Sequence, residues 1–443
     1  MSHRLVEVGT SILAIVAASR PVPEARSPAT FHPQLLSCSG CLRVQNGRAT
    51  SFVSPGATPN RRRARPRWQG NRKYTRKYRV HGPFQETGST GSTSSQSATR
   101  DTWSDTRVAT SGKEKNATVL RPLTPDQLPD ESIYLLDGTA MLFKAFYGRG
   151  AGGYLAADGA TEVGAVLAMG VEFARFVNEV KPRYVAMAFD VGRETTFRRD
   201  IFPGYKAQRK PHPADLTLQV PLARALMEAL GCRTFALEGF EADDVMATLA
   251  RWARSVGLGV VVCSSDKDMC QLVRDRVHIM QSGRDGFVVL GDEEVLLKYG
   301  VRPQSLPDFF GLVGDSADNI PGVKGIGRKR GSHLLDRFGN LEGIFSGVEE
   351  VGKMNIRGSK AIQALLSKPE VQDEALLYRE IATLHDEVPL DGIEDLKSSL
   401  LLYKGVAPEA ESVMKVLGFA APLRMIQQGN PHLAPMAVDM DLF

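Results

Sequence analysis

Short apolar runs alternate with helical patterns through the middle of the chain. The runs are SIYLLDG, RYVAMAFD and LGVVVCSSDKD, and each has a length typical of a buried strand. Apolar helical patterns span residues 162–180, 221–231 and 243–256. Because strands that alternate with helices form parallel sheets covered on both faces, the pattern predicts an α/β fold around a mainly parallel central sheet.

Each of the three apolar runs ends in an acidic residue. Asp137 ends the first run, Asp190 ends the second, and Asp266 and Asp268 lie just beyond the third. In a parallel sheet the carboxyl ends of the strands meet at one edge, where ligands gather. We therefore expect these four carboxylates to face one common crevice.

Two further acidic clusters extend the pattern. The stretch EGFEADDVMATLARWA places Glu241, Asp243 and Asp244 at the start of a helix, and GLVGDSADNIPGVKGIG contains Asp315 and Asp318. Helix capping and the helix dipole explain one or two of the first three acids, but not all three beside acids from three strands. Converging like charges are stabilised by a cation, and oxygen ligands favour Mg²⁺ or Mn²⁺.

The acids are numerous enough for two divalent ions, which together can clamp the attacking and leaving oxygens of a phosphodiester. If these acidic residues were only helix caps and surface charges, their pattern would require independent coincidences at five places along the chain. We therefore prefer a metal site. The predicted ligands are Asp137, Asp190, Glu241, Asp243, Asp244, Asp266, Asp268, Asp315 and Asp318.

A glycine-rich turn follows the last acidic cluster. Gly322, Gly325 and Gly327 punctuate PGVKGIG between two helical stretches, and Lys324 lies among them. Small residues let backbone amides approach a phosphate, and the lysine adds positive charge. The arrangement resembles a helix-hairpin-helix motif, which grips the backbone of a duplex without reading its sequence.

A basic loop, RETTFRRDIFPGYKAQRKPHP, follows Asp190 directly. A solvated surface loop is one interpretation of it. Its place at the mouth of the predicted crevice favours a second interpretation, in which it clasps a nucleic-acid strand by charge and stacking. The predicted basic residues are Arg193, Arg198, Arg199, Lys206, Arg209 and Lys210, and Phe197, Phe202 and Tyr205 offer faces for stacking.

The first 129 residues differ in composition from the rest of the chain. Lys and Arg outnumber Asp and Glu 16 to 3 in residues 1–100, whereas acids outnumber bases 47 to 39 beyond them. Arg- and Ser-rich, acid-poor segments are typical of organellar transit peptides and disordered linkers. A secretory signal at SILAIVAAS is the alternative, but five cysteines, an odd and low number, do not indicate a disulfide framework. No apolar run reaches about 18 residues, so we expect no membrane span.

Five motifs, in this order, resemble the 5′–3′ exonuclease domain of bacterial DNA polymerase I and the wider flap endonuclease family. They are LLDGTAMLFKAFYG, AFDVGRETTFRRDIFPGYKAQRK, GFEADDVMATLA, SSDKDMCQLV and GLVGDSADNIPGVKGIG. The resemblance covers about residues 131–425, and no polymerase region follows it. With the basic N-terminal segment, the chain resembles a stand-alone plant member of the family in a plastid or mitochondrion, with the plastid favoured.

The resemblance implies a domain organisation and an activity. It implies a PIN-like nuclease core at 130–300 with a helical arch at about 193–220, a helix-hairpin-helix subdomain at 301–425 and a flexible tail at 426–443. The implied activity is metal-dependent hydrolysis of phosphodiesters at 5′ flaps, nicks and RNA-primed ends of DNA in organellar replication and repair. The implied protein is a monomer that works beside an organellar DNA polymerase.

The resemblance also implies roles for individual residues. Two Mg²⁺ or Mn²⁺ ions are expected, the first held by Asp137, Asp190, Glu241, Asp243 and Asp244 and the second by Asp266, Asp268, Asp315 and Asp318, with K⁺ at the hairpin. Lys206 and Arg209 match residues that stabilise the cleaved phosphate, and Tyr205 matches one near the unpaired 5′ nucleotide. Lys144 stands where the family has Arg, which keeps a DNA-binding charge but loses the planar guanidinium fork.

Two other functions stay open at this point. The first is a non-catalytic nucleic-acid-binding protein on the same scaffold, against which all nine retained acids argue. The second is an RNA-processing nuclease with similar acid-tipped strands, which would not predict the hairpin motif at 321–327. A structure-specific nuclease explains both features.

Overall fold

The computed structural model describes residues 128–129, 131–148, 152–192, 196–283, 286–390, 393 and 401–429 of the 443-residue chain. All of these residues belong to one compact unit. The predicted transit peptide and linker, apart from residues 128–129, and positions 430–443 of the expected tail lie outside the described residues. None of the helices within the described ranges is long and apolar enough to cross a membrane.

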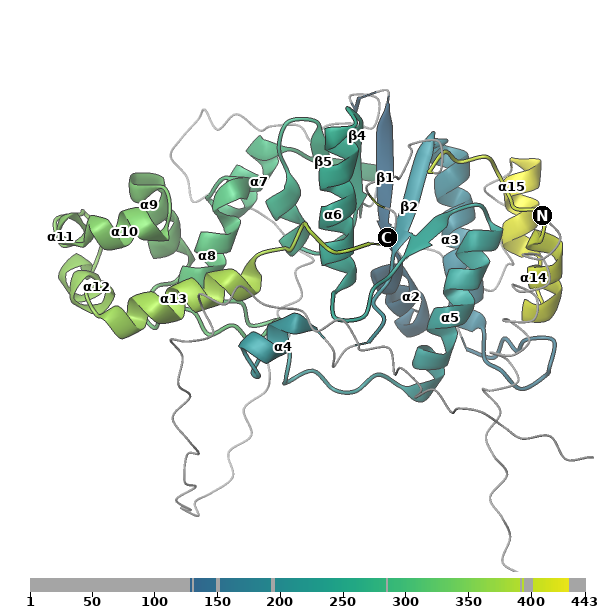
Figure 1. The fold of residues 1–443 in the computed structure, drawn as a ribbon, viewed down its shortest axis with the longest axis horizontal. Coiled ribbons are helices and arrows are strands. Elements are labelled where there is room, and N and C mark those ends of the chain that lie inside the picture. The colour runs from purple at the N-terminus through teal and green to yellow at the C-terminus, as the bar shows by residue number, and fades with distance from the viewer. Residues whose placement is uncertain are drawn as a thin grey trace, which may run out of the picture. The chain divides into compact units, whose positions relative to one another are not determined.

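A six-stranded sheet in the order β3–β2–β1–β4–β5–β6 is the central element of the fold (Figure 1). Neighbouring strands are parallel except for β5 and β6, which form an antiparallel pair. The predicted mainly parallel α/β sheet is thus confirmed. The strands are β1 Ser132–Asp137, β2 Tyr184–Ala188, β3 Arg233–Phe235, β4 Gly259–Cys263, β5 Val277–Gly283 and β6 Gly286–Leu290.

The sheet is buried on both faces, which explains why its strands read as continuous apolar runs. In β4, Val260 and Val262 join the hydrophobic cluster on one face, and Val261 between them joins the cluster on the other. Side chains of a strand alternate between faces, so a strand covered on both sides needs apolar residues at every position.

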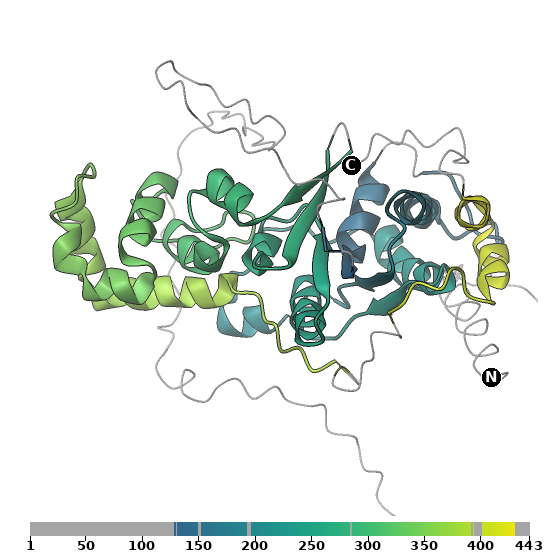
Figure 2. The ribbon, with the colours of Figure 1, turned by 90° about the horizontal axis from the view of Figure 1, so that it is seen from above.

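Helices from separate parts of the chain cover the two faces (Figure 2). One face carries α2 Gly138–Tyr147, α3 Gly164–Val180, α5 Ala214–Ala229 and α14 Ala410–Leu417, with α15 Ala421–Gln428 packed on α3. The other face carries α6 Ala242–Ser255 and α7 Asp292–Tyr299. Helix α15 includes residues 426–428, which are the first three residues of the segment expected to be a flexible tail.

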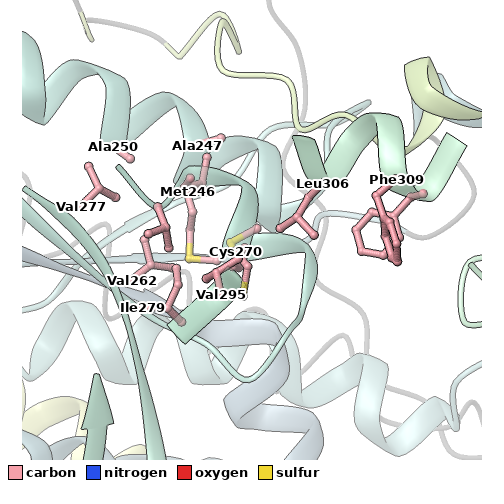
Figure 3. Close-up of a cluster of buried hydrophobic side chains, with 14 of the residues drawn as sticks. Met246, Ala247, Ala250, Val262, Cys270, Val277, Ile279, Val295, Leu306 and Phe309 are labelled. Carbon is pink, nitrogen blue, oxygen red and sulfur yellow. The ribbon is translucent and has the colours of Figure 1, made fainter. Parts of the chain in front are cut away.

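The core beneath α6 continues into a helical region, as Figure 3 shows. Leu306 and Phe309 of α8 extend the same cluster that packs α6 against the sheet. The side chains labelled there are Met246, Ala247, Ala250, Val262, Cys270, Val277, Ile279, Val295, Leu306 and Phe309. The helical region consists of α8 Leu306–Val313, α9 Arg328–Phe338, α10 Leu341–Ser346, α11 Val348–Val351, α12 Ser359–Leu366 and α13 Pro369–Ala382.

Residues 314–327 form the connection between α8 and α9, as the helix-hairpin-helix prediction requires. Gly314 and Gly322 face each other across this turn, with φ angles of +81° and +67°. A Cβ atom on Gly322 would lie 2.3 Å from the backbone nitrogen of Gly314. The two halves of the turn can approach this closely only because Gly314 and Gly322 lack a side chain.

A basic segment connects β2 to α5. It contains the short helix α4 Phe197–Ile201 and a turn region up to Pro213. Lys206 adopts a left-handed conformation, with φ at +51°. Its backbone N–H donates to the carbonyl oxygen of Asp318 at 3.0 Å, which joins this segment to the α8–α9 turn.

Candidate metal centre

The ends of β1 and β2 hold two of the predicted acids in place. Asp137 caps the N-terminus of α2: its carboxylate accepts hydrogen bonds from the Ala140 N–H at 2.8 Å and the Ser264 hydroxyl at 3.2 Å. Asp190 accepts from the Ala242 N–H at 2.7 Å. These contacts connect the C-terminal edges of β1, β2 and β4 with the start of α6.

Three further acids meet beyond β4. Asp268 begins the short 3₁₀ helix η2 Asp268–Leu272, and Asp315 and Asp318 lie in the turn after α8. One carboxylate oxygen from each lies within 4.8 Å of the others. Asp266 joins them by accepting a hydrogen bond from the Asp268 N–H at 2.9 Å. Residues separated by about fifty positions in the sequence thus share one site.

One oxygen of this group is suited to a cation. The Oδ1 atom of Asp268 is buried and has no hydrogen-bond partner in the part of the chain that the structure describes. A buried carboxylate oxygen without a donor is costly, whereas a hard divalent ion accepts such an oxygen as a ligand. The residues present therefore fit a divalent metal.

Burial and mutual repulsion raise the pKa values of three of the predicted ligands, Asp137, Asp243 and Asp268. Burial raises the pKa of Asp137 to about 7, and the charges of Asp190 and Asp266 add to the effect. Burial also holds the pKa of Asp243 well above its usual range, again helped by Asp266 and Asp137. The pKa of Asp268 is raised in the same way, by burial and then by Asp266. The acids near the ends of β1 and β2 and the acids beyond β4 therefore form one electrostatically linked cluster.

Basic side chains balance part of this negative charge. Lys206 Nζ lies 2.9 Å from Glu241 Oε1, and Arg209 Nη2 lies 2.6 Å from Asp318 Oδ1. Lys267 Nζ lies 2.7 Å from Asp315 Oδ2. Burial alone would raise the pKa of Glu241, but Lys206 and then Arg198 outweigh it and lower that pKa.

The structure corrects the predicted roles of Asp244 and Arg198. Asp244 is fully buried, and both of its oxygens accept hydrogen bonds from the Arg198 guanidinium at 2.7 Å. Arg198 is only 2% exposed and also donates to the carbonyl oxygens of Ile381 and Thr383. Both Asp244 oxygens are thus occupied by hydrogen bonds within the protein, and Arg198 offers almost no surface to DNA. We interpret both as positioning residues.

Tyr205 is also placed differently from the prediction. Its side chain is 3% exposed, and its hydroxyl group contacts Glu241 Oε2 at 2.8 Å and Asp318 Oδ2 at 3.1 Å. A ring buried this deeply has no open face on which a base could stack. In the described conformation Tyr205 links the basic segment to the acidic cluster instead.

The remaining predicted residues lie near the surface. Lys210 and Lys324 are exposed, as are Gly325 and Gly327 beside the start of α9, whereas Gly322 is partly buried in the hairpin turn. Lys144 lies half-buried on α2, where it lines a cavity next to Asp137. Their contacts with DNA stay predictions.

Sequence reasoning missed several residues that shape the site. Thr139 accepts a hydrogen bond from the Asp190 N–H at 2.8 Å, Ser264 donates to Asp137, and Lys267 pairs with Asp315. Thr139 and Lys267 stand within two positions of predicted acids, and that proximity was the available signal. Glu172, a buried acid on α3, had only its apolar surroundings to mark it.

The chain matches two adjoining protein families. Residues 132–300 match the family described as 5′–3′ exonuclease, N-terminal resolvase-like domain. Residues 301–401 match the 5′–3′ exonuclease, C-terminal SAM fold. The two matches together cover more than half of the chain.

Curated relatives of the chain include bacterial DNA polymerases. DNA polymerase I of Bacillus subtilis is 35% identical over 303 residues, which is 68% of this chain and 33% of that protein. DNA polymerase I of Bacillus caldotenax is 33% identical over 314 residues, which is 69% of this chain and 34% of that protein. The chain thus spans about a third of the length of these relatives.

Two solved structures are among those similar to the chain. The T5 5′-exonuclease with bound zinc is similar with a TM-score of 0.45 and 21% identity, covering 68% of this chain and 100% of the other. The catalytic core of Rad2 in complex with DNA substrate is similar with a TM-score of 0.44 and 15% identity, covering 70% of this chain and 95% of the other.

Removing one partner of the Arg198–Asp244 pair should destabilise the protein strongly. Arg198→Met leaves the Asp244 carboxylate buried without its counter-charge, which typically costs about 3–5 kcal/mol. We expect a large fall in the urea midpoint of unfolding. Arg251→Met is the matched control, because Arg251 pairs with Asp386 and Glu387 at the exposed surface and its loss should leave the midpoint unchanged. Equal midpoints for the two variants would contradict a structural role for the buried pair.

The metal-free protein should lose stability as the pH rises towards neutrality. The folded-state pKa values of Asp137, Asp243 and Asp268 are raised, so the folded protein binds more protons than the unfolded chain. Stability is then fully present below the ordinary pKa near 4 and is lost as the pH rises through about 7, the value for Asp137.

The measurement is the melting temperature in EDTA and in Mg²⁺ between pH 5 and pH 8. We expect the stabilisation by Mg²⁺ to grow with pH by several degrees, since about 1 kcal/mol corresponds to roughly 2–4 °C for a domain of this size. Asp243→Asn should flatten the pH dependence in EDTA. A Mg²⁺ effect that is the same at every pH would contradict the assignment of these acids to a cation site.

Proposed function

Because the chain belongs to the 5′–3′ exonuclease family, we propose that it is a divalent-metal-dependent 5′–3′ exonuclease and flap endonuclease. The observation that carries the proposal is a set of eight carboxylates close enough for their charges to affect one another, three of which lie within 4.8 Å of each other. One Asp268 oxygen in this set is buried and has no partner among the described residues. A protein that only binds nucleic acid has no use for so much repulsion at its binding surface.

The acids fall into two groups that could hold two ions. Asp268, Asp315 and Asp318 supply one group, with Asp266 beside them. Asp137, Asp190, Glu241 and Asp243 supply the other, and Asp244 is withdrawn from it. These carboxylates would hold a pair of Mg²⁺ or Mn²⁺ ions, which would supply the Lewis-acid chemistry for phosphodiester hydrolysis.

The basic segment supplies the contacts to the phosphate in this proposal. Lys206 and Arg209 pair with Glu241 and Asp318, at the border between the two acid groups. At that border the ammonium group of Lys206 and the guanidinium group of Arg209 would lie within reach of the negative charge on the cleaved phosphate. Lys206 and Arg209 would thus neutralise part of the acidic charge in the metal-free protein. In the metal-bound protein they would stabilise the reacting phosphate.

The hairpin between α8 and α9 is proposed to hold the duplex next to the cleaved strand. Its exposed glycines let a phosphate approach the backbone, and Lys324 adds charge beside them. A K⁺ ion at the hairpin is part of the proposal, because the family resemblance implies one there. Binding of this kind recognises the backbone of any duplex, so the substrate class is DNA with 5′ flaps, nicks or RNA-primed ends rather than a particular sequence.

Cleavage of a labelled 5′ flap tests this function. We expect the purified protein to release the flap from a nicked duplex in Mg²⁺ or Mn²⁺, and to bind without cutting in EDTA. Asp243→Asn, which removes one charge from the cluster, should lower kcat at least about a hundredfold and leave duplex affinity within roughly twofold. Asp336→Asn, an exposed acid on α9, is the matched control and should cleave normally. Tight binding without cleavage in any divalent metal would replace this function by a non-catalytic one.

We further propose that the protein acts in a plastid or mitochondrion, as a monomer beside an organellar DNA polymerase. The support is the basic, acid-poor composition of residues 1–100. Residues 1–127 fused to a fluorescent protein should direct it into an organelle of plant cells. Secretion or an even distribution through the cell would contradict this location.

A further inference from the structure

A cavity of about 250 Å³ lies beside the metal centre, between α2, α3 and strands β4 to β6. Asp137 forms part of its wall, so the cavity and the acidic cluster share a residue. Its size is below the range of about 300–1,000 Å³ that holds drug-sized ligands. The cavity therefore suits a single small ring system.

Glu172 is the unusual residue of this cavity. It lies in the middle of α3, is only 8% exposed, and lines the cavity. Its Oε1 atom is buried and has no hydrogen-bond partner within the described ranges. Burial raises the pKa of Glu172 to about 8, although Lys144 and Arg175 act against it. A buried polar atom without a partner is costly and indicates that a ligand completes its hydrogen bonds.

The cavity wall combines flat apolar surface with hydrogen-bonding groups. Phe176, Phe287 and Met280 supply aromatic and thioether surface. Glu172 and Gln281 supply polar atoms. A nucleobase has the same division, because its faces stack on apolar side chains and its edge carries donors and acceptors.

The charges around the cavity exclude the simpler ligands. Lys144 lines the same wall as Glu172 and disfavours a cation there. The acids beside Asp137, among them Asp190 and Asp266, disfavour a free anion such as phosphate. A neutral group that both donates and accepts hydrogen bonds satisfies this lining.

We propose that this cavity is a nucleobase pocket, which receives the base of a nucleotide next to the cleaved phosphodiester. Glu172 forms hydrogen bonds with the edge of that base. The inference rests on the proposed nuclease function, because Asp137 is what brings the cavity to the reacting phosphate. Binding the base there would fix the position of the phosphate at the metal centre. Glu172 is then a positioning residue rather than a catalytic one.

The test compares flap substrates that lack a single base. A tetrahydrofuran abasic unit replaces each of the two nucleotides that flank the cleaved bond, one at a time, and dissociation constants are measured in Ca²⁺ by fluorescence anisotropy. We expect wild-type protein to bind one of these abasic substrates roughly five- to tenfold more weakly than the intact substrate.

Variants of Glu172 decide whether that loss belongs to this pocket. Glu172→Met, which keeps the length of the side chain, should bind the intact substrate as weakly as wild type binds the abasic one, with no further loss on the abasic substrate. Glu172→Gln keeps the hydrogen bonds and should retain most of the preference for the base. Glu179→Gln, an exposed acid on the same helix, is the matched control and should behave as wild type.

A second readout needs no variant. A 2-aminopurine base at the sensitive position should change its fluorescence when wild-type protein binds in Ca²⁺, because the base leaves its stacked neighbours for the pocket. The proposal is overturned if removing either base has no effect, if wild type and Glu172→Met show equal abasic losses, or if the fluorescence does not change. Cleavage of the intact flap by wild type in Mg²⁺ tests the nuclease function separately, so the two failures are distinguishable.

Discussion

The repulsion among buried carboxylates at one edge of the sheet is the constraint on which the rest of the structure depends. Parallel strands bring their carboxyl ends to the same edge, and acids at those ends therefore converge whether or not their charges are compensated. Burial, and after it the neighbouring carboxylates, raise the pKa values of Asp137, Asp243 and Asp268, so their charged forms are disfavoured without further positive charge. Neighbouring parts of the fold supply positive charge to this edge, and the remainder is left for cations.

The positive charges that reach the edge come from different segments. Lys206 and Arg209 come from the segment between β2 and α5, and Lys267 comes from the loop after β4. A different cation, Arg198, is buried and binds Asp244 at the start of α6 together with the carbonyl groups of Ile381 and Thr383 at the C-terminal end of α13. Asp244 in turn accepts the Glu241 N–H at 3.2 Å. The buried pair thus fixes the helix terminus that presents Glu241 and Asp243.

The sequence was sufficient for the architecture and for the group of acids. Apolar runs that end in Asp137, Asp190 and Asp266 predict both the sheet and the edge at which the acids meet, because those consequences follow from strand geometry. The sequence could not show which of Asp243 and Asp244 faces the crevice. Neighbouring residues on a helix point about 100° apart, and which one faces the crevice depends on what packs beneath. That partner, Arg198, belongs to a basic segment that the sequence predicts to be a loop, and only the structure shows α4 there and the contacts with Ile381 and Thr383.

Glu172 is a second residue whose environment could not be predicted from the sequence. An acid among apolar residues on a helix is visible in the sequence, but a single exposed position would explain it equally well. Only the packing of α3 against the sheet shows that this carboxyl is buried, and only the cavity beside Asp137 gives it something to contact. Since Asp137 belongs to both the cavity and the acidic cluster, a group bound in one alters the electrostatics of the other. Recognition of the base and positioning of the phosphate would then depend on one shared carboxylate.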